Sequence, residues 1–134
     1  MNSFDVFKVS GSALHAQRRR MNVIASNLAN AQSTRTDEGG PYKRQEVVFA
    51  TTSISCGMKG VKVDDVVTDG KPPRPVYDPG HPDANEEGIV MMPNINPMEE
   101  MVNMMMAFRA YEASVSTFNM SKNMMLRSLE IGRS

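Results

Sequence analysis

Apolar side chains recur at both ends of this chain in alternating steps of three and four residues, and this spacing restricts the possible folds more than any other feature. Near the N-terminus the series is Phe4, Phe7, Gly11, Leu14, Met21, Ala25 and Leu28. Only Arg18 interrupts it. The spacing is the 3.5-residue repeat of a coiled-coil seam, sustained over more than three heptads. With Ser3 as a possible cap and a polar run at 32–34 as a stop, the pattern predicts a long N-terminal helix.

A second and stronger series follows Pro97. Asn96 is a good N-cap, Pro97 suits the first helical position, and Glu99 has the spacing of a capping box. Gly132 is suited to end the helix. With Lys122 as the one polar interruption, the seam positions are Met101, Met104, Phe108, Tyr111, Val115, Phe118, Met125 and Leu129. We expect about 35 residues of helix, about 50 Å long.

The middle of the chain is interrupted by glycine and proline. Residues 42–50 and 61–68 have the composition of strands, and residues 88–92 form a short apolar strand. Turn signals occur at Asp69-Gly70 and at 78–80. The sequence therefore predicts a mainly α fold. Residues 1–34 and 97–134 are expected to pair as an antiparallel coiled coil, with residues 35–96 as a small antiparallel β insert.

Charge and cysteine content exclude several classes of protein. Fifteen basic and fifteen acidic side chains give a net charge of zero, which argues against nucleic-acid binding and permits self-association. The single cysteine, Cys56, excludes an intramolecular disulfide and a cysteine metal cage, and we interpret it as a small apolar residue. No run approaches the roughly 18 apolar residues of a membrane span. Since the start also lacks the pattern of a secretory signal, the residues alone predict a cytoplasmic protein.

The C-terminal helix has more apolar surface than one partner helix can cover. The chain has thirteen methionines and no tryptophan, and between 98 and 108 apolar residues point in nearly every direction around the helix axis. A helix that is apolar all round must be covered all round. The N-terminal helix supplies small residues that permit close approach. We therefore predict that the outer faces dock onto neighbouring molecules, and that head-to-tail contacts would build a ring or an open filament.

Other interpretations of these motifs remain open. The methionines at 98–106 could bind copper(I), but an adaptable interface explains them without a metal. The loop at 78–87 lacks calcium-binding spacing and is interpreted as a rigid turn that contacts a neighbour. The basic run at 18–20 could bind phosphate, although helix-surface charges are the simpler interpretation. Arg18, in the seam, must either find a partner, for which Glu112, Glu99 and Glu100 are candidates, or reach solvent along its stem. His15 has no nearby nucleophile, so no catalytic residue, cofactor or enzymatic activity is predicted.

The same stretches resemble a known family. Residues 16–31 (AQRRRMNVIASNLANA) are similar to the N-terminal signature of flagellar rod and hook-type axial proteins. Residues 40–44, 76–84 and the segment from 100–102 to 109–113 resemble the proximal-rod branch designated C of the flagellar basal-body rod proteins. The resemblance extends over essentially the whole chain. Ser114 and Ile89 depart from it, because asparagine and an aromatic residue are usual there.

This resemblance implies a structural subunit that transmits motor torque. It implies export through the flagellar type III apparatus without a cleaved signal, and a place in the rod that crosses the periplasm. The implied partners are copies of the chain, other rod proteins and the export-gate adaptor at the rod base. A methionine-rich metal-binding module is the alternative function. A different axial protein nearer the hook is disfavoured, because the chain leaves room for only a small insert.

The sequence also predicts which residues make contacts between subunits. The predicted loop contacts are Asp78, Pro79, Gly80, His81, Pro82 and Asp83. The predicted helical interface residues are Leu14, Gln17, Arg18, Met21, Ala25, Asn27, Leu28, Asn30, Met101, Met104, Met105, Phe108, Tyr111, Val115, Phe118, Met125 and Leu129.

Overall fold

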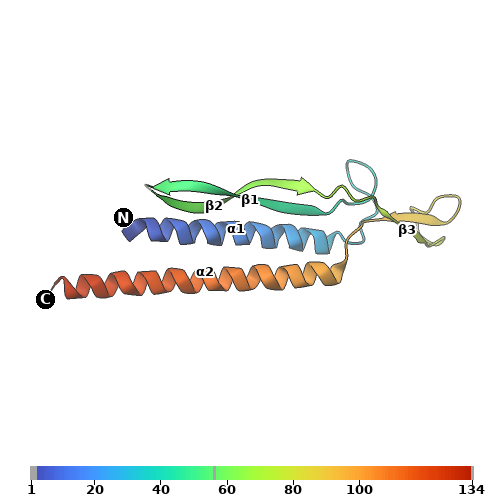
Figure 1. The fold of residues 1–134 in the computed structure, drawn as a ribbon. Coiled ribbons are helices and arrows are strands. Elements are labelled where there is room, and N and C mark those ends of the chain that lie inside the picture. The colour runs from blue at the N-terminus through green and yellow to red at the C-terminus, as the bar shows by residue number, and fades with distance from the viewer. Residues whose placement is uncertain (1–2, 56, 134) are drawn as a thin grey trace.

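The computed structural model describes residues 3–55 and 57–133, without the side chain of Ser3, so the expectations for a Ser3 cap and for Cys56 fall outside it. Its elements are α1 (Ser3–Ala29), β1 (Gln45–Ser55), β2 (Met58–Thr68), β3 (Arg74–Tyr77), β4 (Ile89–Met92) and α2 (Pro97–Ile131). The two helices lie side by side with both chain termini at the same end, so they are antiparallel (Figure 1). The predicted mainly α architecture, with small antiparallel β hairpins between two long helices, is confirmed.

The two ends of α2 agree in part with the predicted caps. The side chain of Asn96 accepts a hydrogen bond from the backbone N–H of Met98 at 3.0 Å, as expected of an N-cap. Gly132 ends the helix, and its N–H donates to the carbonyl of Ser128 at 3.1 Å. The predicted capping box is wrong, because Glu99 is exposed and makes no return hydrogen bond within the described residues.

The first hairpin pairs β1 with β2 and packs against α1. The strands are antiparallel, from Gln45 opposite Thr68 to Ser55 opposite Met58, with register shifts after Val48 and after Ser53. Both extend further toward the turn than predicted. β1 also starts later, since the segment before Gln45 is held by contacts with α1 instead of strand pairing.

The second hairpin pairs β3 with β4 and projects beyond the helix pair (Figure 1). β4 matches the predicted apolar strand at 88–92. β3 was not predicted, because Pro75 lowers the strand propensity of this four-residue segment. It is accommodated in a two-stranded sheet, where every strand has an edge free of pairing.

α1 forms the middle layer of the helical part. The first hairpin covers one side of it and α2 the other (Figure 1). The buried apolar residues are small or medium in size: Ala16, Val23, Ile24, Val90, Ile95 and Ala107. The core is thin, as expected for a chain with few aromatic residues. An edge-to-face aromatic pair, Phe7 with Phe118 at 5.0 Å between ring centroids, joins the start of α1 to the middle part of α2.

The predicted seam of α2 is partly wrong in phase. Met104, Tyr111, Val115, Phe118 and Met125 are half-buried as expected, but Met101, Phe108 and Leu129 are more than half exposed. The inward face is instead centred on Glu100 and Ala107, which a hydrophobic pattern does not select.

The relative register of the helices explains the exposure of Leu129. Asn27 contacts Glu100 and Phe7 contacts Phe118, so the last turns of α2 extend past the start of α1 (Figure 1). The side chains on this projecting end have no helix opposite them. On α1, Phe4 and Ala25 were assigned to the seam, but both are exposed. They lie on neither of the two sides of α1 that α2 and the first hairpin cover.

Candidate assembly site

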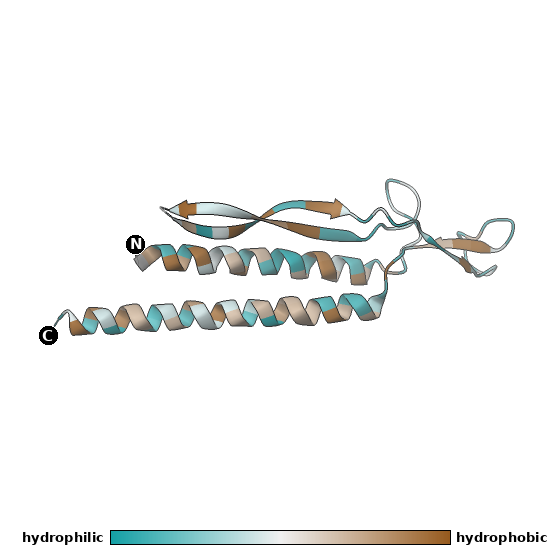
Figure 2. Ribbon diagram, viewed as in Figure 1, coloured by the Kyte–Doolittle hydropathy of each residue, from teal (hydrophilic) through white to brown (hydrophobic). Residues whose placement is uncertain are grey.

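The outer face of α2 is a broad exposed apolar surface. Hydrophobic residues are distributed along the whole helix (Figure 2). The large apolar side chains of α2 that are 49% or more exposed are Met98, Met101, Val102, Met105, Met106, Phe108, Met120, Met124, Leu126, Leu129 and Ile131. We call this set the α2 outer face. They fall into two groups along the helix, from Met98 to Phe108 and from Met120 to Ile131. Exposed apolar surface of this extent marks an interaction site more often than a free surface.

A buried polar cluster lies under the start of α2. Asn27 of α1 and Glu100 of α2 are 0% and 1% exposed, and the Asn27 Nδ2 donates to Glu100 Oε2 at 3.1 Å. The Asn27 side chain also bonds the backbone of Gln45 in both directions, with Nδ2 donating to its carbonyl at 2.8 Å and Oδ1 accepting from its N–H at 3.0 Å. Tyr42 donates to the same Oδ1 at 3.2 Å. One amide thus joins α1, β1 and α2.

Arg44 completes this cluster. Its Nε donates to Glu100 Oε1 at 2.6 Å, and its guanidinium lies 3.4 Å from Glu46 and 3.9 Å from Asp69. Partial burial lowers the pKa of Arg44, but the hydrogen bonds and negative charges of Glu100 and Glu46 outweigh it and raise the pKa above its ordinary value. The buried carboxylate is therefore paired with a permanent cation, which is the condition for tolerating a buried charge.

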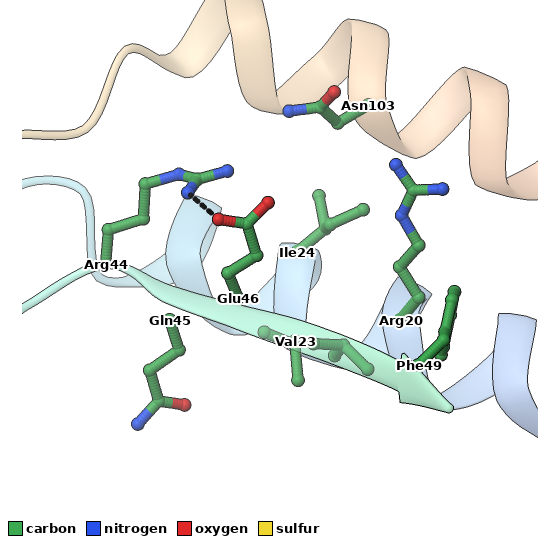
Figure 3. A pocket seen from close by; sticks show the side chains of 9 residues that line it. Arg20, Val23, Ile24, Arg44, Gln45, Glu46, Phe49 and Asn103 are labelled. Carbon is green, nitrogen blue, oxygen red and sulfur yellow. Dashed lines mark hydrogen bonds and ion pairs between the residues drawn. The ribbon is translucent and has the colours of Figure 1, made fainter. Parts of the chain in front are cut away.

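A cavity of about 160 Å³ opens next to the cluster, between α1, β1 and α2. Figure 3 shows Arg44 and Glu46 at one end and Arg20 at the other, with Asn103 above them on α2. Val23, Ile24 and Phe49 form its apolar part. It is too small for a drug-sized ligand and large enough for a side chain.

The loop at 78–88 is held in a fixed conformation. Asp83 accepts from Thr34 Oγ1 at 2.7 Å and from Arg35 at 2.6 Å, which ties the loop to the segment after α1. Gly88 has φ +76° and lies against Tyr77 and Pro79, so a side chain there would be strained and would collide with both. A turn is therefore present where the sequence predicts one, and its contact with a neighbour stays a prediction. The described residues include no group of three or more His, Cys, Asp or Glu side chains that could hold a metal ion.

The predicted interface residues fall into different environments. Arg18 and Ala25 are exposed, Asn27 is buried, and the remaining α1 positions, Leu14, Gln17, Met21, Leu28 and Asn30, are half-buried. In the loop, His81 and Asp83 are half-buried, and the others are exposed. Whether these residues contact other subunits stays a prediction.

Of the two possibilities predicted for Arg18, exposure to solvent is the one seen in the part of the chain described. Arg18 is exposed and makes no ion pair there, while its candidate partner Glu100 binds Arg44. Sequence reasoning missed Arg44 and Tyr42, because nothing local signals contacts with residues 56 and 15 positions away in the sequence.

Comparison with known proteins matches both ends of the chain to the same class. Residues 7–35 match the family model described as flagella basal body rod protein, and residues 86–131 match the C-terminal model of flagellar basal body rod FlgEFG proteins. The fold and these matches define a flagellar basal-body rod protein, a structural class that is not enzymatic. Within the described residues, no helix is both long and apolar enough to cross a membrane.

Curated relatives specify the family further. The chain is 45% identical over 134 residues to the flagellar basal-body rod protein FlgC of Escherichia coli O6:H1, covering 99% of this chain and all of that protein. It is 43% identical to FlgC of Salmonella typhimurium and 40% identical to FlgC of Bacillus subtilis, with the same coverage. The chain therefore belongs to the FlgC family of flagellar basal-body rod proteins. As a structural rod subunit, it assembles with other rod subunits.

Proposed function

We propose that this subunit builds the proximal rod by packing the α2 outer face against neighbouring rod subunits, and that the resulting wall of helices transmits motor torque to the hook and filament. The observation that supports this is the extent of the exposed apolar surface on α2. Within one copy, α1 covers a single side of α2 and the first hairpin covers α1 instead. Burying the outer face between subunits removes apolar surface from water and stabilises the assembly.

Methionine suits such a contact for a physical reason. Its unbranched thioether side chain adapts to irregular surfaces, so one helix can fit neighbours that differ in detail. Once packed, side chains at the density of a protein interior transmit strain with little compression. Torque can then pass from subunit to subunit through packing alone, without any chemical step.

The partners and the route to the rod rest on membership of the family. The proposed partners are copies of this chain, other rod proteins and the export-gate adaptor at the rod base. The proposed route is the flagellar type III export apparatus, without a cleaved signal peptide, to the part of the rod that crosses the periplasm. No specific observation favours the methionine-rich metal-binding module as a second function.

A pair of charge-adding variants tests the role of the α2 outer face. Met105 is 59% exposed, so Met105→Asp places a charge on this face without disturbing the core. Gln32→Glu also adds one negative charge at an exposed position, but outside α2, and serves as the control. In cells lacking the native gene, we expect Gln32→Glu to restore swimming and Met105→Asp to fail. Full swimming with Met105→Asp, at equal protein levels, would refute docking through this face.

A further inference from the structure

Arg20 is a half-buried arginine with no ion pair in the described part of the chain, although it lines the cavity between α1, β1 and α2. Figure 3 shows its guanidinium reaching toward α2, near Asn103. Arg44, at the opposite end of the same cavity, is paired with Glu100 and Glu46. Arg20 therefore offers an unpaired cation in this lining to an anion that comes from outside this copy.

The cavity has the chemistry of a site for a carboxylate side chain. Val23, Ile24 and Phe49 offer apolar surface to an aliphatic stem, and its volume of about 160 Å³ is suited to one side chain. Arg20 can bind a carboxylate with two parallel N–H donors. The side chain of Asn103 also has no hydrogen bond within residues 3–55 and 57–133, so its amide is free to donate as well. Glu46, the one acid in the lining, is held by Arg44.

We propose that this cavity is a socket for a glutamate from the 85–88 turn of a second copy of the chain, an inference that rests on the proposed assembly into a rod. Glu86 and Glu87 are exposed at the tip of that turn and make no ion pair in the residues described. Charge complementarity with Arg20, the unpaired cation in the cavity lining, favours them as the occupants.

The turn presents these two acids in a fixed position. Asn85 Oδ1 accepts from the N–H of Glu87 at 3.0 Å and from that of Ile89 at 2.8 Å. The N–H of Gly88 donates to the carbonyl of Asn85 at 2.9 Å. A pre-organised tip loses little conformational entropy when it docks, which strengthens a contact without enlarging it.

The position of the turn gives the contact a direction. The second hairpin projects from one end of the molecule (Figure 1). The cavity is lined instead by residues of α1, β1 and α2. A contact between the tip of one copy and the cavity of the next joins two different surfaces. Such a head-to-tail contact propagates into an open helical array, the symmetry that a rod requires.

Charge reversal with a matched control tests the socket in cells. Arg20→Glu reverses the charge in the cavity, and Arg19→Glu makes the same change at an exposed neighbour outside it. We expect Arg20→Glu to reduce the number of complete rods per cell by about tenfold, and Arg19→Glu to leave it within about twofold. Glu86→Lys with Glu87→Lys should cause a similar loss, and combining both with Arg20→Glu should restore rods.

Two further experiments apply if Arg20→Glu does not fold: a variant that removes the charge without reversing it, and a cross-link. Arg20→Met keeps the aliphatic stem and removes the charge, and it should also reduce rods. In a Cys56→Ser background, Arg20→Cys with Glu87→Cys should form an intermolecular disulfide in oxidised basal bodies, whereas Arg19→Cys with Glu87→Cys should form much less.

The two hypotheses fail in different ways. Equal rod numbers for the Arg20 and Arg19 variants would overturn the socket, and so would a folded triple variant that does not restore rods. Loss of rods with Arg20→Glu that no change at Glu86 and Glu87 rescues would overturn the assignment to a second copy. If these variants assemble normally while Met105→Asp does not, the socket is wrong and the proposed role of the α2 outer face stands.

Discussion

Arg44 binds Glu100 through a 2.6 Å hydrogen bond from Nε to Oε1, and this contact joins the start of α2 to the segment that leads into β1. Glu100 is 1% exposed, so the pair holds a charge inside the molecule at the point where helices and hairpin meet. Because its charge is buried and paired with an arginine, the contact fixes the relative register of the elements more than it adds net stability.

Removing one partner of this pair should destabilise the fold. Glu100→Ala leaves the guanidinium of Arg44 and the amide of Asn27 without their shared acceptor, and we expect a loss of about 2 kcal/mol in the free energy of unfolding. Thermal or urea unfolding measures it. Glu99→Ala, at the exposed neighbouring position, is the control and should change stability by less than about 0.5 kcal/mol. Equal stability of the two variants would contradict the role of the cluster.

The same pair should be insensitive to pH over the neutral range. Folding raises the pKa of Arg44, which means that the folded state favours its charged form. Its contribution is therefore fully present below its ordinary pKa and is lost only as the pH rises through the folded value, in strongly alkaline solution. The stability difference between native protein and Arg44→Met should stay constant from about pH 6 to 9. A difference that changes across this range would indicate that another group titrates with the pair.

Close approach of the first hairpin to α1 depends on Gly60. A Cβ added there would collide with the end of the Ile54 side chain on β1 and would lie 2.7 Å from the hydroxyl oxygen of Ser12 on α1. That hydroxyl already donates to the carbonyl of Val9 and accepts from the N–H of Val61. Gly60→Val should therefore cost about 1–3 kcal/mol through overpacking. Gly70→Ala has nothing within 4 Å of the added atom and should be nearly neutral. If unfolding experiments found Gly60→Val as stable as Gly70→Ala, the hairpin would not be docked as described.

The free subunit should be unevenly ordered. The cluster end of the helix pair combines buried side chains with several hydrogen bonds, whereas the last turns of α2 extend beyond α1. We expect hydrogen exchange in the monomer to be slowest near Asn27 and Ala107 and fastest after Ser121, with protection of this end appearing on assembly. Uniformly slow exchange along both helices of the monomer would contradict this.

The two helices and their antiparallel pairing could be predicted because their apolar repeats are long and their ends have recognisable caps. The face that each helix turns inward could not. The contact between them is centred on Asn27, Glu100 and Ala107, and only the tertiary hydrogen bonds to Gln45 and Arg44 make the polar residues suitable for burial. A hydrophobic pattern assigns such polar residues to the outside of the helix and assigns Met101 and Phe108 to the inward face instead.

The candidate assembly site, like the fold, could be predicted only in part from the sequence. The excess of apolar surface on α2 was evident from the methionine-rich sequence, since no small insert could cover it. The cavity at Arg20 and the tether at Asp83 were not, because each depends on contacts between segments distant in the sequence. Only the fold brings them together.

Electron microscopy of basal bodies from cells that lack this gene tests the central claim most directly. If the chain is a structural subunit of the rod, the cells should be non-motile and their basal bodies should have no rod beyond the membrane ring, and the native gene should restore both. Swimming cells with complete rods would contradict the account.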